Sequence, residues 1–509
     1  MVLDQFGEAA AARLSGWWAL PATHEVYNRA PPIKTARLTA MKLSPSTVAT
    51  AALALCMMAS LSLWPQALST PGVDLFRYWA IPVAHRADNV HLGSPYTAVA
   101  QYTQALHKQL AERADLALSR AAAEALPFDL TATPLLYYLH GLAPMNYWAY
   151  LYGYRITQIV GLWAAIALLA GLCSGRWAWA CLFAALATAA SDPLLLDVNV
   201  GNTNAHQVLL LACVAAMAAR RGAMTITMHG AVALMLVGLT LYKPTVALGA
   251  ILLAWVHLQR MTHLGRAVWT LAAAACGALF AVLPCIFFGS DRVWSDWFAE
   301  LTSAADRISY PLSAGNISTV SYLAERMHTS VPTAIIGLGS LLLTSVIVCG
   351  TTRTRSPPAR LESVMNPTVY IATGLGLVMM LALSPLVWNH YLVLLLLPIV
   401  YLLCHEDVPR PAAWLGLFGL LLCTGIGRRL FQLPIGLPAT WVPISLMLAW
   451  LPAWLALLLS GRSIWRRAWC AGFQAPGTRG HPDDDKAPSC LACAIPRSRA
   501  LAEPHGTAQ

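Results

Sequence analysis

An acidic residue stands directly beyond the first long apolar run of the chain, within the stretch Val73–Trp79. Asp74 lies there with Arg77, Tyr78 and further aromatic residues. One interpretation is structural: a carboxylate at a helix end that pairs with Arg77. The other is chemical: a carboxylate near a membrane interface is partly desolvated, its pKa rises toward the working pH, and it can act as a general base. This segment alone leaves both interpretations open.

A lysine followed by a proline interrupts the apolar stretch 230–256. That stretch has about 27 residues, whereas one bilayer crossing needs about 20. We therefore predict a hairpin or a broken helix at Pro244, with Lys243 at its tip. Lys243 either snorkels to the membrane surface or contacts a phosphate, as a cation at a helix break would favour.

Two other polar stretches lie next to apolar helices. Asn202 and Asn204 open a helix, where they either cap its first free N–H groups or accompany a bound hydroxyl or anion. Trp388, Asn389 and His390 occupy a tight turn between two apolar helices. Trp388 alone would suit an interfacial aromatic belt. An aromatic ring beside amide and imidazole groups also suits a sugar, and His390 can hold a phosphate oxygen or transfer a proton.

A pair of arginines follows a later apolar run. Arg428 and Arg429 lie on the side of the membrane where basic residues are otherwise scarce. Arginine pairs bind phosphate well, although the anionic headgroups of bulk lipid are an alternative partner.

The composition indicates the elements that must position these residues. Of 509 residues, 58% are hydrophobic and only 11% are charged, against roughly 25% charged in soluble domains. The charges separate long apolar runs, which predicts an all-α polytopic membrane protein in the lipid bilayer. The net charge is +10, and the basic residues lie mainly at the predicted helix ends. No nucleic-acid partner is therefore expected.

Hydropathy divides the chain into a cytoplasmic segment 1–46, a multi-span domain 47–459 and a disordered cytoplasmic tail 460–509. Large outer loops are predicted at 65–151 and 289–331. Arginines recur in the loops assigned to the cytoplasm. About twelve spans are predicted, with ten to thirteen as the range: 47–64, 152–173, 177–190, 204–219, 229–242, 244–259, 267–288, 332–349, 367–384, 390–404, 411–426 and 438–459.

In this topology every polar stretch described above lies at the outer ends of the spans. Polar groups near membrane depth cost a few kcal/mol each unless they find partners or face a cavity. We therefore expect one outward-facing cavity, in the inner (plasma) membrane, lined from segments far apart in sequence.

Several common sequence motifs for binding cofactors and nucleotides are missing from the sequence. There is no Walker A loop and no glycine-rich nucleotide domain, and Asp-x-Asp occurs only in the tail run 483–485. Cys490 and Cys493 form one isolated pair in that tail, a weak metal signal. We expect no cofactor and no metal. The energy for any group transfer would then come from an activated substrate already in the membrane.

The order of these motifs resembles glycosyltransferase family 87. The motifs are Asp74 after the first span, Ser94-Pro95-Tyr96, Gly201-Asn-Thr-Asn204, Lys243-Pro244, Asn316-Ile-Ser318 and Ser384-Pro385 with Trp388-Asn-His390. That family includes polyprenyl-phosphate-mannose-dependent α-mannosyltransferases of the bacterial envelope. The resemblance implies a GT-C-type bundle, an inverting transfer from a polyprenyl-phosphate sugar, with mannose favoured, and a glycan or glycolipid acceptor on the outer, periplasmic face.

The resemblance also implies roles for single residues. Asp74 matches the catalytic acidic position, and Lys243 and His390 match positions near the donor phosphate. Asn202 stands where glutamine is expected and Asn389 where aspartate is frequent. The predicted site combines Asp74 as general base, donor-phosphate contacts from Lys243, His390, Arg428 and Arg429, and sugar or acceptor contacts from Arg77, Tyr78, Tyr96, Asn202, Asn204, Asn316, Trp388 and Asn389. The alternatives are a transporter or flippase of a polar lipid or solute and a non-catalytic scaffold of envelope assembly.

Overall fold

The computed structural model describes 18 helical segments. The described residues are 47, 51, 70–87, 92–113, 118–119, 122–123, 132–143, 146–171, 192–219, 225–307, 316–350, 367–405, 408–423 and 446–473. All of them belong to one unit, residues 43–509. Outside the described residues lie the predicted segment 1–46, almost all of the first span 47–64, the span 177–190, and Arg428 and Arg429.

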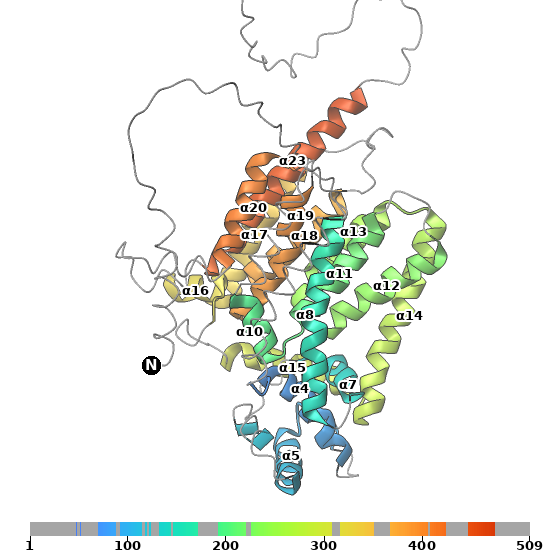
Figure 1. The fold of residues 1–509 in the computed structure, drawn as a ribbon, viewed down its shortest axis with the longest axis vertical. Coiled ribbons are helices and arrows are strands. Elements are labelled where there is room, and N and C mark those ends of the chain that lie inside the picture. Colours follow the sequence, from blue (N-terminus) through green and yellow to red (C-terminus); the bar gives the residue numbers. More distant parts are fainter. Residues whose placement is uncertain are drawn as a thin grey trace, which may run out of the picture. The chain divides into compact units, whose positions relative to one another are not determined.

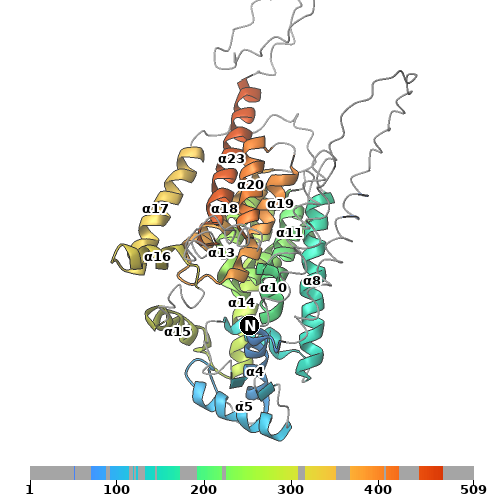
Figure 2. The ribbon, with the colours of Figure 1, turned by 60° about the vertical axis from the view of Figure 1, so that its left-hand side comes forward.

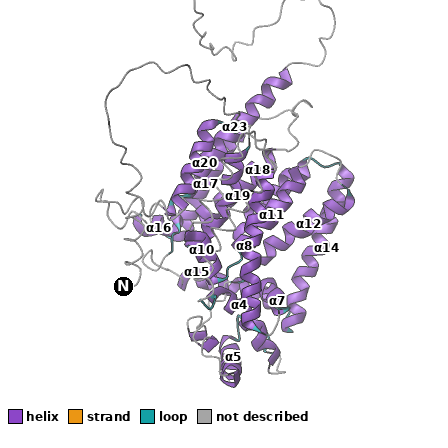
Figure 3. Ribbon diagram, viewed as in Figure 1, coloured by secondary structure: helices purple, strands orange, loops and turns teal. Residues whose placement is uncertain are grey.

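The part of the chain that the structure describes contains helices and loops without strands (Figure 3), so the all-α prediction is confirmed. The elements are α4 (Val73–Ala87), α5 (Val99–Arg113), α7 (Pro134–Gly141), α8 (Tyr147–Gly171), α10 (Asp192–Val200), α11 (Asn204–Ala219), α12 (Ile226–Tyr242), η3 (Pro244–Val246), α13 (Ala247–Gln259), α14 (His263–Phe288), α15 (Val293–Arg307), α16 (Thr319–Arg326), α17 (Val331–Gly350), α18 (Pro367–Leu383), η5 (Asn389–Leu395), α19 (Leu396–Cys404), α20 (Arg410–Cys423) and α23 (Trp450–Phe473).

The longer apolar helices share one core. It is built from α8, α11, α12, α13, α18, α19, α20 and α23, and its residues are Leu, Val, Ile and Ala at nearly every buried position. A second core joins α4, α5, α7, the start of α8 and the end of α14. It is rich in Tyr and Trp. Figures 1 and 2 show α4 and α5 together at one end of the longer helices. Asp74 is in the first turn of α4 and bonds Asn202 just before α11, so it lies where the two cores meet.

The chain breaks sharply after α12, as the sequence predicts. Lys243 ends α12 in an extended conformation and Pro244 opens η3. The helices on either side of the break are bent by 119°. Pro244 has no N–H to continue the helix and disfavours the helical conformation of the residue before it. A second bent pair, α16 and α17, has an angle of 117°.

The described residues contain fewer candidate membrane spans than the sequence predicts for the whole chain. By length and composition, the described helices supply one helix able to cross a membrane, α14, or up to three if each bent pair is one span. The helical parts of the other apolar spans are shorter than 18 residues in five cases, whereas a crossing needs about 20. The predicted number of about twelve is therefore not confirmed, although apolar helices do occupy most of the predicted positions.

Two predicted boundaries fall within helices. The tail was expected to be disordered from 460, but α23 continues to Phe473. The residues between 462 and 471 carry no proline or glycine and are mostly good or moderate helix formers, so the helix propagates past the apolar part. The first outer loop was expected to reach 151, but α8 begins at Tyr147.

Candidate active site

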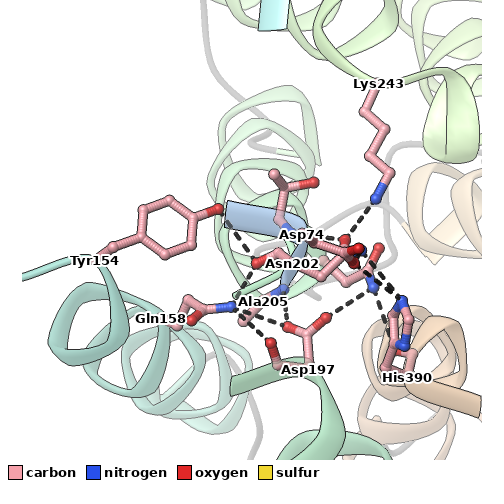
Figure 4. A network of polar contacts seen from close by, with 10 residues as sticks. Asp74, Tyr154, Gln158, Asp197, Asn202, Ala205, Lys243 and His390 are labelled. Atoms are coloured by element: carbon pink, nitrogen blue, oxygen red, sulfur yellow. Dashed lines mark hydrogen bonds and ion pairs between the residues drawn. The ribbon is translucent and has the colours of Figure 1, made fainter. Parts of the chain in front are cut away.

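Four segments that are far apart in the sequence bring polar side chains together (Figure 4). Asp74 comes from the first turn of α4, Asn202 from the turn between α10 and α11, Lys243 from the helix break, and His390 from the start of η5. The sequence predicted all four as site residues. The structure places them in one hydrogen-bonded network.

The side-chain amide of Asn202 is the centre of this network. Its Nδ2 donates to Asp74 Oδ2 at 2.6 Å and contacts His390 Nε2 at 3.1 Å. Its Oδ1 accepts from Lys243 Nζ and from the backbone N–H of Thr203. Because lysine only donates, Oδ1 must face Lys243 and Nδ2 must face the other two groups. His390 Nε2 therefore accepts, and in the neutral ring the proton lies on Nδ1.

Asp74 keeps access to solvent while its neighbours are more enclosed. The Asp74 side chain is 21% exposed, and its Oδ2 lies 4.0 Å from His390 Nε2. Within the described residues Asp74 and Arg77 form no ion pair. The structural interpretation of Asp74 as the partner of Arg77 is therefore not supported by the geometry. A partly exposed carboxylate with one fixed oxygen is able to accept a proton from a bound hydroxyl.

Lys243 points into the protein. The residue is only 8% exposed, its Nζ donates to Asn202 Oδ1, and it lies 5.0 Å from the centre of the Tyr391 ring. Its backbone carbonyl accepts from Gln207 Nε2 at 3.1 Å. A snorkelling lysine would extend its amine to the surface, so that alternative does not describe Lys243. The side chain supplies a positive charge beside Asp74 and His390.

The turn that carries Asn202 depends on a glycine. Gly201 has φ +69°, in the left-handed region that glycine tolerates best. A Cβ added there would lie 2.6 Å from the Cβ of Leu75. Only a residue without a side chain therefore lets this turn approach α4 closely enough for Asn202 to reach Asp74.

A second carboxylate, that of the buried residue Asp197, forms hydrogen bonds with the same turn. Asp197 is fully buried. Its Oδ1 accepts from Asn204 Nδ2 at 2.8 Å, and its Oδ2 accepts from the Ala205 N–H at 3.2 Å and from Gln158 Nε2 at 3.4 Å. Burial raises the pKa of Asp197. All of these neighbouring groups are donors, however, and they favour the ionised form.

Asp197 also caps the helix that Asn202 and Asn204 were predicted to open. The free N–H of Ala205, at the start of α11, is bonded to its carboxylate. A carboxylate at a helix N-terminus is favourable because of the helix dipole. The protein's own carboxylate therefore caps this N–H group, and a bound hydroxyl or anion beside Asn202 and Asn204 remains a prediction.

A buried arginine fixes the two segments that meet at this turn. Arg155 Nε donates to Val198 O at 3.0 Å, and Nη2 donates to Asn199 O at 2.8 Å. The same Nη2 donates to the backbone O of Thr70 at 3.0 Å and to its hydroxyl at 2.7 Å. Arg155 thus joins the end of α10 to the residues that precede α4, and so sets the distance between Asn202 and Asp74.

Several predicted contact residues have structural partners in place of open faces. Asn316 accepts from the Ser318 and Val387 N–H groups at 3.0 Å each and donates to Pro385 O at 3.2 Å, which shapes the turn before η5. Tyr96 is buried and donates to Ala132 O at 2.6 Å. For both residues a sugar contact remains a prediction.

Other predicted residues border the network. Tyr78 lies one turn after Asp74, and burial, followed by the charge of Asp74, raises its pKa well above the usual value. Arg77 Nε and Asn389 Oδ1 are both buried without a hydrogen-bond partner, and their sugar or acceptor contacts remain predictions. Trp388 precedes η5 and accepts the Tyr391 N–H at 2.9 Å on its backbone oxygen.

Among the described residues, no group of three or more His, Cys, Asp or Glu side chains could hold a metal ion. The network combines a carboxylate, Asp74, with a cation, Lys243, and an imidazole, His390. These groups match a transfer in which a hydroxyl loses a proton and an anionic group leaves.

Comparison with known proteins decides the family. Residues 130–385 match the family model of Glycosyltransferase family 87, and this region is about half of the 509 residues. The chain belongs to glycosyltransferase family 87. No curated protein and no solved structure matches it. The matched region of this family 87 enzyme contains Asn202 and Lys243, whereas Asp74 and His390 lie outside it.

Sequence reasoning about this family 87 enzyme missed three residues that support the site. Asp197, Arg155 and Gln158 were not among the predicted site residues, although each is a polar residue in an apolar stretch. Such residues are expensive at membrane depth and mark functional positions. That signal could have identified them as candidates, but only the packing of α8 against α10 and α11 shows what they bond.

Proposed function

We propose that this family 87 enzyme transfers a sugar, mannose in the first instance, from a polyprenyl phosphate to an envelope glycan or glycolipid. The transfer takes place on the outer, periplasmic face of the cell membrane. Family membership establishes a glycosyltransferase; the donor, the acceptor and the mechanism are the proposal. The observation that carries it is Asn202, which joins the partly exposed Asp74 to Lys243 and His390.

The reaction follows from those positions. Asp74 accepts the proton of an acceptor hydroxyl, and the hydroxyl oxygen attacks the anomeric carbon of the donor sugar. The bond between that carbon and the phosphate oxygen breaks on the opposite face, which inverts the anomeric centre. The electron pair leaves with the polyprenyl phosphate. Lys243 and His390 stabilise the charge that develops on the leaving phosphate.

The amide of Asn202 has a supporting role in this scheme. It holds one oxygen of Asp74 at 2.6 Å, so the other oxygen is left to face the acceptor. Because its own oxygen bonds Lys243, Asn202 also keeps the cation close to the base. The proton acceptor and the phosphate-binding groups are thereby held at a constant separation before any substrate binds.

The donor can be tested in cells that lack the gene, complemented with the wild-type chain. Mass spectrometry would quantify envelope glycans and polyprenyl-phosphate sugars in both strains. We expect the deletion to lose one glycan and to accumulate one polyprenyl-phosphate sugar, with both changes reversed by the wild type. A lost glycan with an accumulated nucleotide sugar, and unchanged polyprenyl-phosphate sugars, would refute the proposed donor.

A further inference from the structure

We propose that Asp197 is a positioning residue for sugar transfer: its buried carboxylate holds the turn 201–204 so that Asn202 joins Asp74 to His390. The inference rests on the function proposed above. Asp197 itself cannot touch substrate, because its side chain is fully buried. It acts only through the groups that it bonds.

The bonds of Asp197 converge on the turn from both its backbone and its side chain. Its carbonyl oxygen accepts from the Asn202 N–H at 3.0 Å and from Gln158 Nε2 at 3.3 Å. Its carboxylate accepts from Asn204 Nδ2 and from the N–H of Ala205. One residue therefore fixes the backbone before Asn202 and the helix start after it. Figure 4 shows Asp197 on the side of Asn202 away from Lys243.

The same carboxylate reaches the segment of His390 through one intermediate. Asn204 Nδ2 donates to Asp197 Oδ1 at 2.8 Å and also lies 3.3 Å from the carbonyl oxygen of His390. The orientation of Asn204 is set by Asp197, because only a nitrogen can face that carboxylate. Asp197 thus holds both ends of the contact between Asn202 and His390.

Gln158 and Tyr154 complete the support from α8. Gln158 Nε2 contacts the Asp197 carboxylate and the carbonyl oxygen of Asn202. The Tyr154 hydroxyl donates to that same carbonyl at 3.2 Å. The backbone of Asn202 is therefore bonded on both sides, which leaves its side-chain amide as the only part directed at the reacting groups.

Replacement of Asp197 by asparagine tests this inference with little change in volume. A carboxylate accepts from three donors here, but an amide has only one oxygen and turns an NH₂ group toward a donor. The turn should then shift. A displacement of about 1 Å in a catalytic arrangement can cost about 100-fold in rate. We therefore expect Asp197→Asn to lower kcat by about 10- to 100-fold. KM for the polyprenyl-phosphate sugar should stay within about threefold of the wild-type value.

A matched control separates positioning from a general loss of stability. Thr373 is also fully buried, in α18, and donates to Val369 O at 2.8 Å. Thr373→Val removes that buried hydroxyl without touching the site. We expect Thr373→Val to lower the thermal midpoint in detergent but to keep kcat near the wild-type value. Equal losses of kcat in the two variants would overturn the positioning role.

A double-mutant cycle identifies the route of the effect. If Asp197 acts through Asn202, then Asp197→Asn should change kcat by less than about twofold in an Asn202→Ala background. A full additional loss in that background would overturn the proposal. If Asp197→Asn does not fold, Asn204→Ala removes the same bridge and is judged by the same cycle.

Two outcomes separate the failure of this inference from the failure of the proposed function. Without any activity on the polyprenyl-phosphate sugar, the proposed donor fails. Asp197 is then judged by amide hydrogen exchange of residues 202–205 in the full-length protein. Faster exchange in Asp197→Asn, absent in Thr373→Val, supports the positioning role, and wild-type exchange in this turn refutes it. If activity is present but Asp74→Asn is fully active, the base assignment fails while the cycle with Asn202 still decides the role of Asp197.

Discussion

The substitution Asp74→Asn isolates proton transfer from the rest of the site. Asparagine has nearly the same shape, and its Oδ1 can still accept from Asn202 Nδ2, which lies 2.6 Å from the carboxylate in the wild type. Because that hydrogen bond survives, the expected cost in stability is only about 1 kcal/mol. The amide cannot take up a proton at neutral pH. Chemistry should therefore fail while the fold remains.

The magnitude follows from the role of a general base. Such a group contributes about 10²- to 10⁴-fold in rate, which corresponds to about 2.7–5.4 kcal/mol of transition-state stabilisation. Because Asp74→Asn leaves the proposed phosphate contacts of Lys243 and His390 in place, KM for the donor should stay within about threefold. The loss is expected in kcat.

The assay uses purified protein in detergent with a short-chain polyprenyl-phosphate mannose and a glycolipid acceptor. Product is quantified by mass spectrometry, and the thermal midpoint of each variant is measured alongside. Asp291 is exposed in the loop after α14, so Asp291→Asn is the matched carboxylate control and should retain wild-type kcat. A folded Asp74→Asn variant whose kcat lies within threefold of the wild type would refute Asp74 as the base.

Three further predictions follow from the geometry. Lys243→Met keeps the length of the side chain but removes its charge, and we expect kcat/KM for the donor to fall about 100- to 1,000-fold; the same change at the exposed Lys108 of α5 should have little effect, and equal losses would argue against a phosphate contact. Gly201→Ala places a Cβ 2.6 Å from Leu75 Cβ at a φ of +69°, so it should cost about 1–3 kcal/mol of stability; the thermal midpoint should fall and partly recover with Leu75→Ala, and an unchanged midpoint would contradict the packing. Burial lowers the pKa of His140 to about 3, below the ordinary value near 6.5, so the folded state resists the proton that the unfolded state binds. From pH 7.5 to 5.5 the wild type should lose about 1.4 kcal/mol of stability from this group, and a thermal midpoint with the same pH dependence in His140→Gln would refute the assignment.

The features that depend on local sequence were predictable. The long apolar runs predict helices because a chain in lipid must satisfy its own backbone, and the described residues are helical throughout their regular elements. The break at Lys243 and Pro244 was predictable because proline cannot continue the hydrogen bonding of α12. The order of the short motifs also predicted the family, which the match over residues 130–385 confirms.

The lengths of the described apolar helices were less predictable, because hydropathy does not limit helix length. An apolar run of 16 residues and one of 20 give similar hydropathy, but the ends of each helix depend on capping and on turns. α11 and α18 have 16 and 17 residues. The extension of α23 past residue 459 has the same origin, since polar residues with good helix propensity continue a helix without adding apolar character.

By itself, the sequence determined which residue types are present at the ends of apolar helices, and hence the acid, the cation and the imidazole of the site. Only the tertiary structure decided which of them meet, because Asp74 and Asn202 are 128 residues apart and Asn202 and His390 are 188 apart. It also decided that Asp197 and Arg155 hold the turn and that Asn316 bonds backbone groups. The direction of a buried polar side chain depends on which donors and acceptors packing brings within reach, and no spacing along the chain specifies that.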